Sequence, residues 1–182
     1  VIVAGPLMNF VLAIVLYGIV AAVGAEVPVS QVDSRVGFIA EDSPASKAPL
    51  YAMAEDGTFD AQGDSVAQGW QTGDRIVSID GDAVHNITDV AISAILGGGE
   101  PMTVVIERPQ PDGGVERFVS IATPQKKEEK EHPRFGVAPF QPALVDSVMP
   151  DSPAEEAGFE SGDVLARADG KIIDSATFTD MV

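Results

Sequence analysis

The sequence contains no cysteine and few basic residues, and these two shortages exclude several classes of protein. Without cysteine, the chain can form neither a disulfide framework nor a metal site built on thiolates. It has 11 lysines and arginines against 28 aspartates and glutamates, which gives a formal net charge of −17. Because nucleic-acid phosphates are bound mainly by Lys and Arg, this balance argues against a nucleic-acid partner.

Histidine is also scarce, and His85 and His132 are the only two. Neither has another candidate ligand at the spacing of a metal-binding motif, so we interpret both as surface residues. No Ser-His-Asp arrangement for nucleophilic catalysis can be assembled from them either. We therefore predict that the chain itself holds no metal site.

Charged residues are absent from the first 25 positions, and Glu26 is the first of them. About 20 apolar residues suffice to cross a hydrocarbon core roughly 30 Å thick, and a helix satisfies its own backbone hydrogen bonds in lipid. We predict a transmembrane helix over residues 1–25, in contact with the lipid bilayer. A buried core helix is one alternative, although such helices seldom stay apolar on every side. A signal peptide is another, although no basic region precedes the apolar run.

The segment after this helix is poor in basic residues, with only Arg35 before Lys47. Short cytoplasmic flanks of membrane helices are rich in Lys and Arg, so we expect the remainder of the chain to lie outside the cytoplasm. The roughly 150 residues that follow the helix suffice for one medium domain or two small ones.

An internal repeat organises this remainder. A Ser-Pro-Ala triplet, a Gly-Asp pair and an Asp-Gly pair occur twice in the same order, at 43–45, 73–74 and 80–81, and again at 152–154, 162–163 and 169–170. The first two landmarks lie 30 positions apart in the first copy and 10 apart in the second, so the first copy carries 20 extra residues. We assign these to an acidic, glycine-containing surface loop at about 51–69. Such repetition indicates two copies of one module.

Local patterns predict the elements of the first copy. Ser43 suits a helix N-cap with Pro44 at the first helical position, and the helix is expected to continue through Leu50. Asp80-Gly81 predicts a hairpin, and Asn86 or Thr88 is the expected cap of a helix that ends before the glycines at 97–99. Strands are expected at 36–40, 75–79, 102–107 and 115–122. The mixed-charge run 125–134 has no apolar face and predicts a solvated linker.

The order strand, Ser-Pro-Ala helix, Gly-Asp turn, strand, Asp-Gly hairpin and helix resembles a circularly permuted bacterial PDZ domain. The resemblance implies α+β modules, each a partly open β-barrel capped by two helices. One such module would cover 35–124 and a second, incomplete one would cover 135–182, with 125–134 as the linker.

PDZ domains bind an extended peptide as an added strand and hold its terminal carboxylate on the N–H groups of a loop. The resemblance places this loop at Val36, Gly37 and Phe38 in the first module. In the second module it places the loop at Phe135, Gly136 and Val137. Alternatively, the two glycines serve only as turn residues.

The apolar helix contains Gly5-Pro6-Leu7-Met8-Asn9, followed by the two modules. This combination resembles the site-2 protease family, the intramembrane zinc metalloproteases of the regulator-of-sigma-E type, which carry a Gly-x-x-x-Asn motif. The resemblance implies that Asn9, with Gly5 and Pro6 as its motif, lies beside the active site. The alternative is that Asn9 joins neighbouring membrane helices by a hydrogen bond and Gly5 lets them pack closely.

The resemblance implies regulated intramembrane proteolysis of a membrane-anchored protein in the inner membrane, with the PDZ modules on the periplasmic side. The His-Glu-x-x-His zinc motif of that family is absent from this sequence, so the zinc ligands are expected outside it, in a longer parent protein. The PDZ pair would either bind a substrate C-terminus or exclude substrates with a bulky outer domain. A non-catalytic PDZ adaptor, membrane-anchored or exported, is the alternative from a different class.

Overall fold

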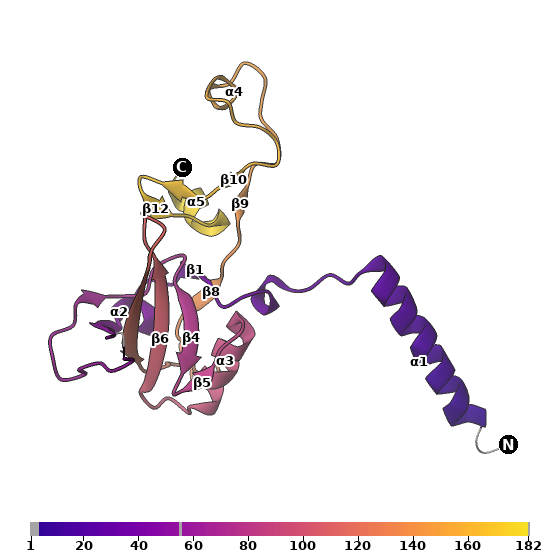
Figure 1. The fold of residues 1–182 in the computed structure, drawn as a ribbon, viewed down its shortest axis with the longest axis horizontal. Helices are drawn as coiled ribbons and strands as arrows, with labels where there is room; N and C mark the ends of the chain where they lie inside the picture. The colour runs from indigo at the N-terminus through magenta and orange to yellow at the C-terminus, as the bar shows by residue number, and fades with distance from the viewer. Residues whose placement is uncertain (1–3, 55, 182) are drawn as a thin grey trace.

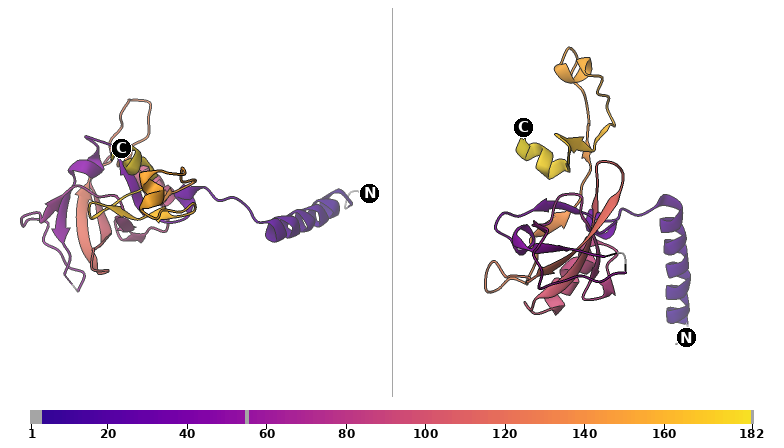
Figure 2. Two further views of the ribbon diagram at one scale, coloured as in Figure 1. Left: turned by 90° about the horizontal axis from the view of Figure 1, so that it is seen from above. Right: turned by 60° about the vertical axis from the view of Figure 1, so that its left-hand side comes forward.

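The computed structural model describes residues 4–54 and 56–181 (Figure 1). Its first element is the helix α1 (Ala4–Val23), which stands apart from the rest of the chain in every view (Figures 1 and 2). Nearly all of its apolar side chains are exposed. The predicted apolar helix is confirmed, and by length and composition it is long and apolar enough to cross a membrane.

A six-stranded antiparallel sheet forms the centre of the globular part, with the strand order β3-β2-β7-β6-β4-β5. Its strands are β2 (Pro49–Ala52), β3 (Ala67–Gln68), β4 (Arg75–Ile79), β5 (Asp82–Ala83), β6 (Met102–Pro109) and β7 (Val115–Ala122). Along β6 buried and partly exposed side chains alternate, as expected of a strand with one face on the core. The sheet does not close into a barrel.

The helix α3 (Ile87–Leu96) packs against this sheet through Ile87, Val90 and Ala94, which recur at the helical spacing. The predicted cap is confirmed, because the Asn86 side chain accepts a hydrogen bond from the Asp89 N–H at 3.0 Å. The short helix η1 (Val29–Gln31) lies beside α3 in the connection that leads from α1.

The region of the 20 extra residues differs from the predicted loop. The helix α2 (Pro44–Lys47) is capped by Ser43 as expected, but it ends before Leu50, and β2 begins at Pro49. Leu50 is fully buried and pairs with Ser120 of β7. The extension is closed at its base, where Pro49 pairs with Gln68. The two ends of the predicted loop therefore form strands, because β7 offers an unpaired edge and the core can bury the side chain of Leu50.

The second copy contains β9 (Ala143–Leu144), α4 (Pro153–Glu156), β10 (Val164–Leu165), β11 (Arg167–Ala168), β12 (Lys171–Ile172) and α5 (Ser175–Met181). Its hydrogen bonds repeat those of the first copy. The Val36 N–H donates to the Asp74 carbonyl at 2.7 Å, and the Val145 N–H donates to the Asp163 carbonyl at 2.8 Å.

The unusual backbone conformations repeat as well. Within residues 4–54 and 56–181, the non-glycine residues with positive φ are Asp42, Asp80, Asp151 and Asp169, and they form two pairs at equivalent positions of the repeat. Because such residues are uncommon, their matched recurrence supports two copies of one module.

The strand β8 (Val137–Pro139) pairs with β1 (Val36–Ile39) of the first copy. Phe135, which was expected to open the second module, is only 2% exposed and its ring centroid lies 5.3 Å from that of Trp70. Val36 matches Val145 in the hydrogen-bond pattern, and the segment 135–140 packs on the first copy through β8 and Phe135.

The predicted linker 125–134 forms a mostly exposed loop whose ends meet. Gln125 and Arg134 each donate a backbone N–H to the carbonyl of the other at 3.0 Å. The loop thus returns the chain to the first unit, next to β7.

Candidate functional site

A small apolar pocket lies between α3 and the loop that leads into β8. Its volume is ≈ 50 Å³, and it is lined by Ile87, Val90, Ala91, Ala94, Arg134, Phe135, Gly136 and Val137. It contains one of the two predicted peptide-binding loops. This loop faces a helix of the first copy, so its pocket is built by the first unit.

The loop is held in a fixed shape that only glycine fits at its centre. Gly136 has φ +85°, and a Cβ atom there would collide with the side chain of Ser43. The carbonyl of Phe135 accepts the Ala45 N–H, and that of Gly136 accepts the Ala40 N–H, both at 2.9 Å. These two carbonyls are therefore satisfied, and two neighbouring segments set the position of the loop.

The N–H groups of the same loop are open. Those of Phe135 and Gly136 donate to no residue within the described part of the chain. The next N–H, that of Val137, points away from β1, because Gly136 and Phe140 on either side of it are the residues that bond to β1. Successive backbone N–H groups in such a turn form a concavity that suits an anion.

Arg134 adds positive charge at the rim of this loop. Its side chain is 59% exposed, and its Nη2 lies 3.3 Å from Oε2 of Glu131. Because most of the Arg134 side chain is exposed, another carboxylate can also reach its guanidinium.

The free edge of β8 is short. Pro139 has no N–H, so beyond the N–H of Val137 this edge offers only the carbonyls of Val137 and Pro139 to an added strand. This edge can pair with the last residues of a peptide but not with a long segment.

The other predicted loop, Val36, Gly37 and Phe38, lies within β1, where β8 is its strand partner. Val36 is fully buried, and a Cβ atom on Gly37 would meet the Pro139 carbonyl and the Asp174 carboxylate. The structure thus places the two predicted loops side by side, with Val137 at the start of β8, the strand partner of β1. Gly37 is required there by close packing, whereas Gly136 is required by its positive φ.

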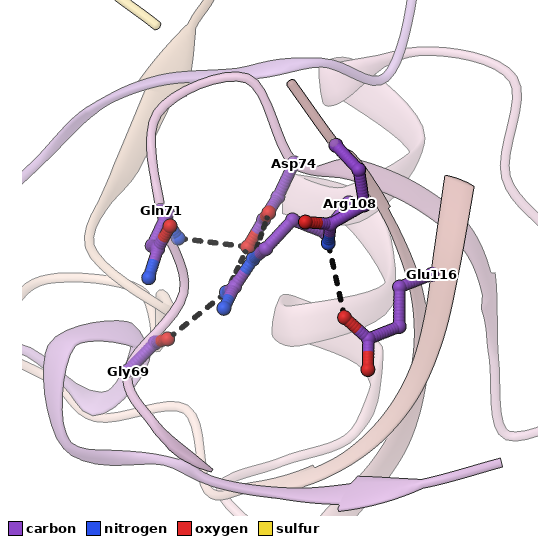
Figure 3. Close-up of polar contacts among 6 residues, drawn as sticks. Gly69, Gln71, Asp74, Arg108 and Glu116 are labelled. Atoms are coloured by element: carbon purple, nitrogen blue, oxygen red, sulfur yellow. Dashed lines mark hydrogen bonds and ion pairs between the residues drawn. The ribbon is translucent and has the colours of Figure 1, made fainter. Parts of the chain in front are cut away.

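A second polar feature, which the sequence patterns did not single out, is the buried ion pair of Asp74 and Arg108 (Figure 3). Nε and Nη2 of Arg108 donate to the two carboxylate oxygens at 2.7 and 2.8 Å, and the side chains are 12% and 1% exposed. Nη2 also donates to the Gly69 carbonyl at 3.2 Å. The pair joins the end of β6 to the Gly-Asp turn and borders a cleft of ≈ 720 Å³ between the first unit and the C-terminal part.

The predicted catalytic motif lies on α1. Asn9 is exposed and its side chain bonds to no residue in the described part of the chain, and no atom lies within 4 Å of a Cβ built on Gly5. Pro6 is the third described residue of α1. The role of Asn9 stays a prediction.

No three metal-ligating side chains gather anywhere in residues 4–54 and 56–181. His85 and His132 are both exposed, which agrees with their interpretation as surface residues. The chain's own residues therefore do not form a zinc site in the described ranges, and the expectation that zinc is bound by residues outside this sequence is retained.

No family model matches the chain, but several curated proteins are similar to it. A zinc metalloprotease of Neisseria meningitidis serogroup A is 30% identical over 175 residues, which cover 94% of this chain and 34% of that protein. Protease RseP of Yersinia pestis is 26% identical over 177 residues, again 94% of this chain and 34% of that protein.

A zinc metalloprotease of Mesorhizobium japonicum is 33% identical over 131 residues, or 71% of this chain and 28% of that protein. The chain spans about a third of the length of the curated relatives that it matches. Over most of its length, the chain is therefore a relative of the RseP-type zinc metalloproteases, the family that its sequence resembles.

Proposed function

We propose that the chain is part of a membrane-embedded zinc endopeptidase, and that its globular part controls which substrates reach the active site. The similarity to named zinc metalloproteases over 94% of the chain supports the enzyme class. In such an enzyme the zinc supplies a Lewis acid for the peptide carbonyl and activates the attacking water. The zinc ligands would lie in other parts of the parent protein.

Asn9 is the residue of this chain that we place near the chemistry. An amide in the hydrocarbon region of a membrane is costly without a partner, and α1 offers none in the described residues. A neighbouring helix of the parent protein would supply this partner at or beside the active site.

We propose that residues 34–140 form a PDZ-like unit and that a second unit begins after them. The matched hydrogen bonds at Val36 and Val145 and the pairing of β8 with β1 support this division. It moves the boundary between the modules from 125–134 to the segment after Phe140.

The function of the first unit follows from the loop 135–137 and its pocket. A terminal carboxylate would accept the N–H groups of Phe135, Gly136 and Val137 with Arg134 at the rim, and the last side chain would enter the apolar pocket. The pocket is small, so we expect a small apolar last residue such as Ala or Val. A protein that remains anchored in the membrane after a first cleavage would present such a new C-terminus on the periplasmic side.

Peptide titration tests this proposal. A fluorescent peptide with a free C-terminal Val and the same peptide amidated are titrated against the full chain in detergent micelles, with anisotropy as the readout. A charge-assisted hydrogen bond contributes about 1.5–3 kcal/mol, so we expect the free acid to bind at least about tenfold more tightly.

Two variants make the result specific. Arg134→Gln is expected to weaken binding of the free acid several-fold, whereas Arg117→Gln, which removes a similarly exposed arginine on β7, is expected to leave it unchanged. Equal affinity for acid and amide would overturn carboxylate binding. The globular part could then act only by size, as a barrier to substrates with bulky outer domains.

A further inference from the structure

An apolar patch lies where the chain from α1 joins the globular part. It consists of Val27, Val29 and Val32 in the connection and of Ile92 and Leu96 on α3, and we call it the connector patch. All five side chains are exposed, from 41% at Val29 to 80% at Leu96. Single exposed apolar residues are ordinary, but five on two adjoining segments point to a contact surface.

The connection is fixed to α3. The Thr88 hydroxyl donates to the carbonyl of Ser30 at 3.2 Å, and the Ile87 N–H donates to the carbonyl of Asp33 at 3.1 Å. Ile92 and Leu96 follow Thr88 by four and eight positions and therefore lie on the same face of the helix. The connection that carries the three valines is thus held against the helix that carries Ile92 and Leu96.

The patch is close to the end of the membrane helix. The six residues 24–29 separate Val23 at the end of α1 from Ser30. At about 3.3–3.6 Å per residue, the seven Cα–Cα steps from Val23 to Ser30 span at most about 25 Å when fully extended. Figure 1 shows the chain passing from α1 to η1 beside α3. With α1 in a bilayer, Ser30, where the connection contacts α3, lies within this distance of the end of α1.

The charges near the patch define which surface it suits. Residues 24–34 and 87–96 contain no Lys or Arg, but they contain Glu26, Asp33 and Asp89. Anionic lipid attracts basic segments, so electrostatic attraction cannot hold this region to a membrane. Apolar side chains at the level of the head groups can do so without charge.

We propose that the connector patch rests on the interfacial layer of the bilayer, on the side where α1 ends, against uncharged head groups. The proposal rests on the membrane location of α1 in the proposed function. It also gives the peptide pocket a position, because α3 presents Ala91 to the pocket and Ile92 and Leu96 to the patch. The pocket would be held close to the membrane surface, where the C-terminus of an anchored substrate emerges.

The absence of cysteine allows single labelling sites in the full chain. Leu96→Cys, Ile14→Cys and Gln62→Cys are labelled with an environment-sensitive fluorophore in phosphatidylcholine nanodiscs that contain nitroxide lipids. Ile14 reports insertion of α1, and Gln62 reports the 56–66 segment, which lies across the sheet from α3 in Figure 1. We expect head-group nitroxides to quench the label at 96 at least about twofold more than at 62, with no loss of quenching in high salt.

The patch itself is tested in the Leu96→Cys background. Ile92→Asp is expected to reduce quenching at 96, whereas Val115→Asp, which changes an exposed valine on β7, is expected to leave it unchanged. Quenching at 96 no greater than at 62, with deep nitroxides still quenching the label at 14, would overturn the proposal while α1 remains a membrane helix. Loss of quenching at 14 would instead overturn the membrane location on which it rests.

Discussion

The buried ion pair between Asp74 and Arg108 provides a sharp test of how the first unit is stabilised. Arg108→Met keeps an apolar stem against Phe118, whose ring lies 5.1 Å from the guanidinium carbon in the native protein. It removes the bidentate partner of a carboxylate that is 1% exposed. Among the described residues, the Asp74 carboxylate would then retain only the hydrogen bond from the Gln71 N–H at 2.7 Å.

The expected cost is large because a charge would be left buried without its partner. Breaking such a pair costs about 3–5 kcal/mol, which is a substantial part of the 5–15 kcal/mol that typically stabilises a domain. For a unit of about 100 residues each kcal/mol lowers Tm by about 4–8 °C, so we expect a fall of at least about 12 °C. Adding Asp74→Asn should recover part of the loss, since no buried charge remains.

Trp70 is the only tryptophan, and it is a suitable reporter. It is 4% exposed, and its indole N–H donates to the Ser120 hydroxyl at 2.9 Å, so its fluorescence follows unfolding of the first unit. Urea unfolding of the full chain in micelles gives the free energy. Arg117→Met is the matched control, because Arg117 pairs with Glu107 at the surface and such pairs contribute about 0–1 kcal/mol. Equal effects of the two variants would refute the reasoning.

Three further changes test local features. Gly136→Ala should destabilise the first unit by about 1 kcal/mol or more in the same urea assay, because residue 136 has positive φ and the Ser43 side chain fills the space of a Cβ. Ser43→Ala should cost about 1 kcal/mol through loss of its cap, whereas Ser152→Ala, at the equivalent cap of α4, should leave the Trp70 signal unchanged. The hydrogen bond from Lys47 lowers the pKa of Asp42, so Lys47→Met should raise that pKa toward its usual value in an NMR titration. Because the folded-state pKa is lowered, the stabilising contribution is present above the unfolded-state pKa and is lost as pH falls through the folded-state pKa.

Much of the local structure could be predicted from the sequence. The apolar run, the caps at Ser43 and Asn86, the Asp80-Gly81 hairpin and the repeat all depend on short-range chemistry, and the structure contains each of them. Asp-Gly predicts a hairpin because both residues tolerate positive φ, and Asp80 and Gly81 have φ values of 51° and 90°.

The features that could not be predicted depend on long-range pairing. Leu50 lies in a strand because β7 offers it an edge 70 positions later, and no pattern near Leu50 shows this edge. Phe135 follows a charged run and was placed at the start of the second module. In the structure Phe135 packs on Trp70, and the Gln125–Arg134 pairing returns the chain to the first unit. The repeat contained a signal for the place of Phe135. The offset of 109 positions from Ser43 to Ser152 matches Val36 of the first copy with Val145, and not with a residue next to Phe135.

The central claim, that the chain is part of a membrane zinc endopeptidase, is tested most directly by a cleavage assay on the parent protein. The purified protein is incubated in detergent with a substrate that has a single membrane span, and cleavage is followed with and without a zinc chelator. We predict cleavage in or near the span, its loss with phenanthroline, and its return when zinc is added. Cleavage that the chelator does not affect, or no cleavage by zinc-loaded protein, would contradict the account and favour a non-catalytic adaptor.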